Sequence, residues 1–144
     1  KFRVSRDIMP RSSYTDADAS QNISTIAMAY SSGNLSVGGE YNMSENTANV
    51  VDNTATGMSF YGSMQVNQTY SVFGRYDDAT SENAAGERWN INNEGNLMIF
   101  GVERKMANGV KVAINMQSWT DATDEGAEEV EAQNTLFLNL GYKF

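Results

Sequence analysis

Side chains that could do acid–base or nucleophilic chemistry are few in this sequence. There is no histidine and no cysteine among its 144 residues, so the commonest general base, the commonest metal ligand and any thiol nucleophile are absent. The adjacent carboxylates of Asp77 and Asp78 could form an acid–base pair, but neighbouring exposed carboxylates are usually only solvated. We therefore expect no catalytic residues, no cofactor and no enzyme activity.

A second concentration of carboxylates lies near the C-terminus, in the segment 121–131. It holds Asp121, Asp124, Glu125, Glu128, Glu129 and Glu131. These residues lack the Asp-x-Asp-x-Asp-Gly order of an EF-hand loop. The segment is therefore expected to be a solvated surface loop, and no dedicated metal site is predicted. The eight methionines are better read as apolar filler than as metal ligands.

Overall composition narrows the classes of partner and of fold. The formal net charge is −8, which argues against a nucleic-acid partner. Mean hydropathy is −0.48, and no apolar run approaches the ~20 residues of a membrane helix. A membrane β-barrel stays compatible with this average, since only alternate residues of its strands face lipid.

These side chains must be positioned by secondary structure, and the sequence indicates strands. The alternation of apolar and polar residues that predicts a strand is clearest at 134–144. Leu136, Leu138, Leu140, Tyr142 and Phe144 share one parity, while the other parity is polar or small apart from Phe137. Alternation with a period of two predicts a β-strand with one apolar face. A length of about ten residues is that of a tilted transmembrane strand.

The same alternation recurs along the chain and predicts about eight strands. The expected strands are 1–9, 22–31, 35–43, 57–66, 70–76, 95–106, 110–117 and 134–144. Tight turns are expected at Ser32-Gly33, at 67–69 and at 107–109, and long polar loops at 11–21, 44–56, 77–94 and 120–133. Long and short connections thus alternate, which places all tight turns at one end of the strands. Arg6 interrupts the apolar face of the first strand unless it lies near a rim.

The ending of the chain resembles the C-terminal strand of Gram-negative outer-membrane β-barrels. In that family a final aromatic and the alternate apolar residues before it serve as an assembly signal, which here implies Leu138, Leu140, Tyr142 and Phe144. The segments 71–77 and 101–119 also resemble the last hairpins of porin-type barrels. Short periplasmic turns and long outer loops are typical of such barrels.

Two sets of candidate site residues follow from strand parity. Charged residues on the polar face would line a lumen: Glu40, Arg75, Glu103, Lys105 and Lys111, with Arg3, Asp7 and Lys143 on the same parity. Aromatic residues on the apolar face would face lipid as interfacial girdles: Tyr30, Tyr70, Tyr142 and Phe144 at the short-turn end, Tyr41 and Tyr76 at the other.

The sequence is therefore expected to fold as an all-β, antiparallel transmembrane β-barrel with about eight up-and-down strands. Residues 1–144 are expected to form one barrel segment, the C-terminal part of a larger barrel in the outer membrane of a Gram-negative bacterium. The expected function is a porin-like channel for passive diffusion of small hydrophilic solutes and ions. Expected partners are membrane lipid, lipopolysaccharide, the barrel-assembly machinery and small solutes; divalent cations could bridge the acidic loop to lipopolysaccharide, and a homo-oligomer is possible.

Two alternatives stay open at this point. In one, eight strands close into a small outer-membrane barrel with a filled interior and a structural, adhesive or loop-presenting role. In the other, the chain is a soluble secreted β-sandwich binding domain, whose apolar residues would converge in a dry core.

Overall fold

The computed structural model describes residues 2–9, 20–122 and 130–142, with side chains from residue 20 onward. Eight strands form one antiparallel sheet in which every strand neighbours the next along the chain. They are β1 (Phe2–Met9), β2 (Gln21–Ser32), β3 (Leu35–Glu45), β4 (Thr54–Gln65), β5 (Tyr70–Glu82), β6 (Gly95–Lys105), β7 (Val110–Asp121) and β8 (Gln133–Tyr142). The prediction of an all-β, up-and-down antiparallel fold is confirmed.

The short connections all lie at one end of the sheet, as the sequence predicted. Between β4 and β5, the backbone N–H of Val66 donates a hydrogen bond to the carbonyl of Tyr70 at 2.9 Å. Residues 67–69 therefore form the turn, as predicted. Between β6 and β7, the 3₁₀ turn η3 (Ala107–Gly109) places Asn108 and Gly109 at positive φ. That conformation suits asparagine and glycine.

The first tight turn differs from its prediction by one residue. Gly33 and Asn34 form it in place of Ser32 and Gly33, because β2 runs on to Ser32, which pairs with Leu35. Gly33, with φ +57°, takes the first turn position, as in the type II′ hairpin turn. Tyr30 consequently pairs with Val37 and not with Leu35. A shift of two residues in register keeps every side chain on its predicted face.

The strands extend further toward the long-loop end than predicted. β5 continues through Asp77 and Asp78 to Glu82, and β3 continues to Glu45, although both segments were expected to be loops. The remaining connections 46–53 and 83–94 contain the 3₁₀ turns η1 (Thr47–Asn49) and η2 (Ile91–Asn93). Strands of 10–13 residues from β2 to β8 exceed the ~5–6 residues usual in soluble proteins.

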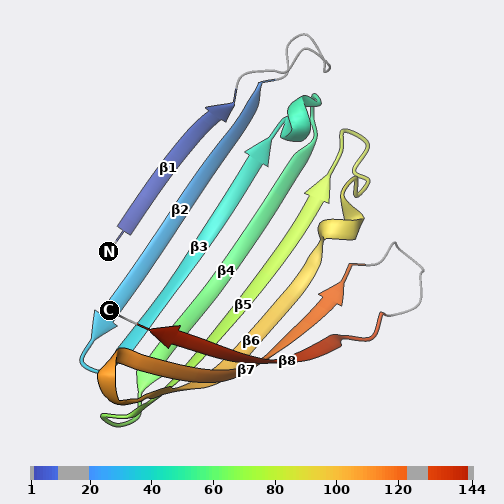
Figure 1. Cartoon of the computed structure of the whole chain (residues 1–144). Coiled ribbons are helices and arrows are strands. Elements are labelled where there is room, and N and C mark those ends of the chain that lie inside the picture. Colours follow the sequence, from blue (N-terminus) through green and yellow to red (C-terminus); the bar gives the residue numbers. More distant parts are fainter. Residues whose placement is uncertain (1, 10–19, 123–129, 143–144) are drawn as a thin grey trace.

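The sheet is strongly curled but not closed into a barrel. In Figure 1, β1 to β5 run side by side, and β6, β7 and β8 swing round in front of them. Among the described residues β1 pairs only with β2, and β8 only with β7. The β1–β8 pairing that a self-contained eight-stranded barrel requires is therefore not formed in this part of the chain. None of the helices among the described residues is both long and apolar enough to cross a membrane.

No second layer covers the sheet in the described part of the chain, so a β-sandwich core is not formed. Val37, Phe60 and Leu138, which such a core would bury, are 42%, 56% and 74% exposed. The closest packing lies within the sheet itself, where aromatic rings cover glycines on the neighbouring strand. Tyr61 covers Gly38, Phe60 covers Gly39 and Phe73 covers Gly101, each ring lying over the residue directly paired with it.

Candidate functional site

The sheet separates apolar and polar side chains onto its two faces. Apolar side chains also differ in exposure between the two faces: on β6, Met98, Phe100 and Val102 are exposed, whereas Leu97 and Ile99, on the opposite face, are partly covered. Side chains spread apart on the outside of a curved sheet and crowd together on its inside. The exposed apolar parity is therefore the convex face, and the parity that holds the charged lumen candidates is the concave face.

The apolar band on the convex face has polar borders. At the long-loop end, Tyr41 and Met58 share a row with Asp78 and Asn96. At the short-turn end the band meets Arg104, whose guanidinium lies 5.6 Å from the ring centre of Tyr70. The band between these borders consists of residues such as Leu35, Val37, Phe60, Met64, Val72, Met98, Phe100, Val102, Ile114, Leu136 and Leu138.

The structure describes five of the six girdle candidates. Tyr30, Tyr41, Tyr70 and Tyr142 are exposed on the convex face, and Tyr76 lies on the same face but is partly covered. Tyr41 lies at the long-loop border and Tyr70 and Tyr142 at the short-turn border, whereas Tyr30 and Tyr76 lie one or two rows inside the band. Leu138 and Leu140 share this face on β8, and Phe144 lies outside the described residues.

Arg6 falls at the polar margin of the convex face, judged from its position in the sheet. Its Cα is paired with that of Ser24. Ser24 continues the row through Met43 and Thr56 to Thr80, which is mostly polar. Of the other inward candidates, Lys143 lies outside the described residues, and Arg3 and Asp7 are placed only by their backbone pairing. The acidic residues 124–129 also lie outside the described part.

A hydrogen-bonded network crosses the middle of the concave face. Arg75 Nε donates to both carboxylate oxygens of Asp77 at 2.8 and 2.7 Å, and Ser59 donates to the same carboxylate. Beside it, Asn42 donates to Glu40 at 2.8 Å and accepts from Thr25 at 2.6 Å. Two of the lumen candidates, Glu40 and Arg75, thus belong to polar chains that run across neighbouring strands.

The adjacent carboxylates of Asp77 and Asp78 do not meet. Asp77 points to the concave face beside Ser59, while Asp78 is paired with Met58 on the convex parity. Successive residues of a strand point to opposite faces, so the structure separates this potential acid–base pair.

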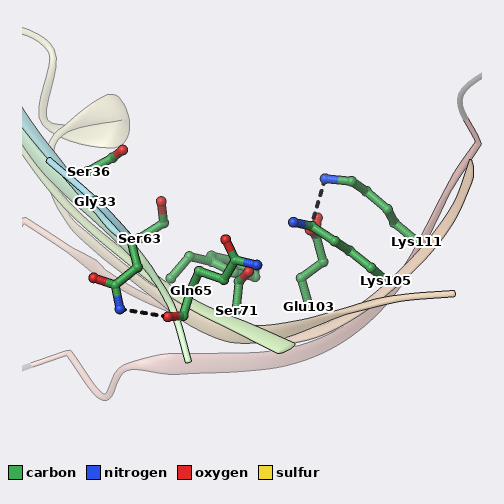
Figure 2. Close-up of a pocket in the computed structure, with 10 residues that line it drawn as sticks. Gly33, Ser36, Ser63, Gln65, Ser71, Glu103, Lys105 and Lys111 are labelled. Carbon is green, nitrogen blue, oxygen red and sulfur yellow. Dashed lines mark hydrogen bonds and ion pairs between the residues drawn. The ribbon is translucent and has the colours of Figure 1, made fainter. Parts of the chain in front are cut away.

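The other three lumen candidates come together in a hollow at the short-turn end. Lys111 Nζ lies 2.9 Å from a carboxylate oxygen of Glu103, and Lys105 is directly paired with Lys111 across β6 and β7. Figure 2 shows these side chains standing on the inner side of the curved ribbon, opposite the side chains of Ser63, Gln65 and Ser71. The hollow is open and lined mainly by polar groups.

A buried carboxylate anchors the β5–β6 connection at the opposite end. Glu94 is 1% exposed, accepts a hydrogen bond from Ser81, and pairs with Arg88 Nε at 2.6 Å. Ser81 also accepts from the backbone of Asn90 at 3.0 Å, and Trp89 Nε1 donates to the carbonyl of Thr54 at 2.8 Å. The connection therefore packs against β4 and β5.

The sequence analysis did not predict the buried Glu94–Arg88 pair or the contact of Arg75 with Asp77. Asp77 could have been found, because it continues the inward parity of Ser71, Phe73 and Arg75. Arg88 and Glu94 lie in irregular backbone, where spacing carries no information about which side chains meet.

In the described residues no group of three or more Asp, Glu, His or Cys side chains is arranged to hold a metal ion. Comparison of the chain with family models, with curated proteins and with solved structures finds no match.

Proposed function

We propose that this chain forms part of the wall of a water-filled β-barrel in the outer membrane of a Gram-negative bacterium. Its function would be passive diffusion of small hydrophilic solutes and ions, with no chemical reaction. The observation that supports this most is the division of the sheet into an exposed apolar convex face and a polar, charged concave face.

The convex face is easier to explain in lipid than in water. Burying apolar surface is worth about 25 cal/mol per Å², and soluble monomers rarely expose contiguous apolar patches beyond a few hundred Å². Here the exposed apolar band extends from Met28 on β2 to Leu140 on β8. Acyl chains would cover this band without a second protein layer.

The concave face suits contact with water. The side chains of Arg75 and Lys111 are 51% and 50% exposed, and each lies within ion-pair distance of a carboxylate. In a narrow dry interior, charges need complete pairing, because an unpaired buried charge is costly. In a wide lumen the same side chains stay hydrated and bias which solutes pass.

The two sheet edges that have no partner among the described residues favour a barrel with further strands over one that closes with these eight. Unpaired strand edges cannot face the hydrocarbon core, where every backbone N–H and C=O needs a partner. Additional strands between β8 and β1 would pair both edges and widen the lumen. In this proposal the exposed face of β8, with Leu138, Leu140 and Tyr142, is also what the assembly machinery would bind.

Fractionation and conductance of the native protein test the proposal. We expect the protein to stay with the membrane pellet until detergent is added, and to produce discrete current steps in a planar bilayer. Recovery in the buffer-soluble fraction would contradict the membrane assignment. Membrane extraction without current steps would contradict the channel and leave the small filled barrel as the better description.

A further inference from the structure

We propose that the hollow at the short-turn end binds small oxyanions, such as inorganic phosphate or carboxylate solutes, with Lys105 as the main cationic group. This assignment rests on the proposed function, since it requires the concave face to be open to aqueous solutes. Small oxyanions would then be the class of solute that this part of the lumen retains.

The hairpin of β6 and β7 brings two like charges together. Lys105 and Lys111 are directly paired and share the concave face at the tight turn 107–109. Like charges directly opposite one another destabilise a β-ladder. A bound anion between them would remove this repulsion, which gives the pairing a physical reason in a ligand-binding hollow.

Glu103 neutralises only one of these two lysines. Its carboxylate lies 2.9 Å from Lys111 Nζ, and both residues line the hollow. Within the described part of the chain, Lys105 makes no ion pair. The lining therefore has two cations against one carboxylate, a local excess of one positive charge in a chain whose net charge is −8.

The remaining lining supplies neutral hydrogen-bonding groups. Ser63, Gln65 and Ser71 lie across the hollow from the two lysines, as Figure 2 shows. A phosphate or carboxylate oxygen accepts hydrogen bonds from hydroxyl, amide and ammonium groups, and lysine binds phosphate as a compact charge. The other described carboxylates on the strands of this face do not line the hollow: Glu40 and Asp77 lie in the central network, and Asp121 lies at the far end of β7, where it accepts a hydrogen bond from Trp119.

Titration of inorganic phosphate tests the assignment without depending on conductance. The native protein is folded in alkyl maltoside micelles, which contain no phosphate, and binding is followed by phosphorus NMR at constant ionic strength. We expect K105Q to weaken binding about fivefold, the effect of one charge near 4 Å in water. E103Q should strengthen binding, because it releases Lys111 from its carboxylate.

R104Q is the matched control. Arg104 is adjacent to Lys105 in β6 and has the same charge, but it lies over Tyr70 on the convex face. Its substitution should leave phosphate binding unchanged. Equal binding by the native protein, K105Q and E103Q would overturn the proposal, as would equal losses in K105Q and R104Q, which indicate only a general charge effect.

Two further measurements distinguish a failure of this inference from a failure of the proposed channel function. Binding of phosphatidylglycerol but not of free phosphate would assign a lipid headgroup to the hollow and overturn the solute assignment. In planar bilayers, phosphate should reduce the current of the native channel more than that of K105Q. Current steps that phosphate leaves unchanged in both proteins contradict this inference alone, whereas phosphate binding without any current steps contradicts the channel function.

Discussion

Gly101 is a position of close packing on the concave face. A Cβ atom there would lie 2.5 Å from the Phe73 ring, 2.6 Å from Asn115 Cβ and 2.7 Å from the carbonyl of Ile114. The ring of Phe73 can lie over β6 only because this position has no side chain. Tyr61 and Gly38 repeat the arrangement between β3 and β4.

Substituting Gly101 should therefore destabilise the sheet. We expect G101A to lower the free energy of unfolding by about 1–3 kcal/mol, the usual cost of overpacking, since backbone lies in the path of the new atom. G57A is the control, because a Cβ there would meet only the Asp78 carbonyl at 3.9 Å. Urea unfolding followed by tryptophan fluorescence measures both. Equal stability of the two variants would show that the close packing at Gly101 is not as described.

At the scale of elements, the strands were more predictable than their ends. Alternation identified the apolar and polar faces because side chains alternate along any strand, whatever its exact register. The one-residue error at Gly33 preserved those faces for the same reason. Asp77 to Glu82 was read as loop because it is polar, yet polar residues continue a strand readily where it extends beyond an apolar band.

The β5–β6 connection could not be predicted in this way. Its form depends on Glu94, Arg88 and Ser81, which meet through irregular backbone. Gly95, the first residue of β6, has a φ of +129°, a conformation that residues with a Cβ rarely adopt. Neither feature has a periodic pattern from which it could be predicted.

E94Q should loosen this connection while leaving the strands intact. Hydrogen bonds to charged groups contribute about 1.5–3 kcal/mol, and Gln keeps the shape of Glu while removing the charge that Arg88 faces. Amide hydrogen exchange in residues 83–93 should become about tenfold faster, with β4 and β7 unchanged. E82Q, at an exposed carboxylate of the same end, should have no such effect. Unaltered protection in E94Q would mean that the buried pair does not anchor the loop.

At the scale of the whole molecule, one curled sheet presents two chemically different surfaces. The apolar side chains of the convex face are more exposed than the side chains of the concave face. The polar network of Arg75 and Asp77 and the hollow around Lys105 share the other surface. The proposed channel, its lipid contact and its anion site all depend on which solvent each surface meets.

A nitroxide scan along β4 in lipid bilayers tests this central claim most directly. The sequence has no cysteine, so each residue from 58 to 65 can be replaced singly and labelled without background. We predict that collisions with oxygen, which dissolves in lipid, are highest at Met58, Phe60, Gly62 and Met64. Collisions with an aqueous nickel chelate should be highest at the alternate positions between them. High nickel collisions at both sets, or an alternation of opposite phase, would contradict the account.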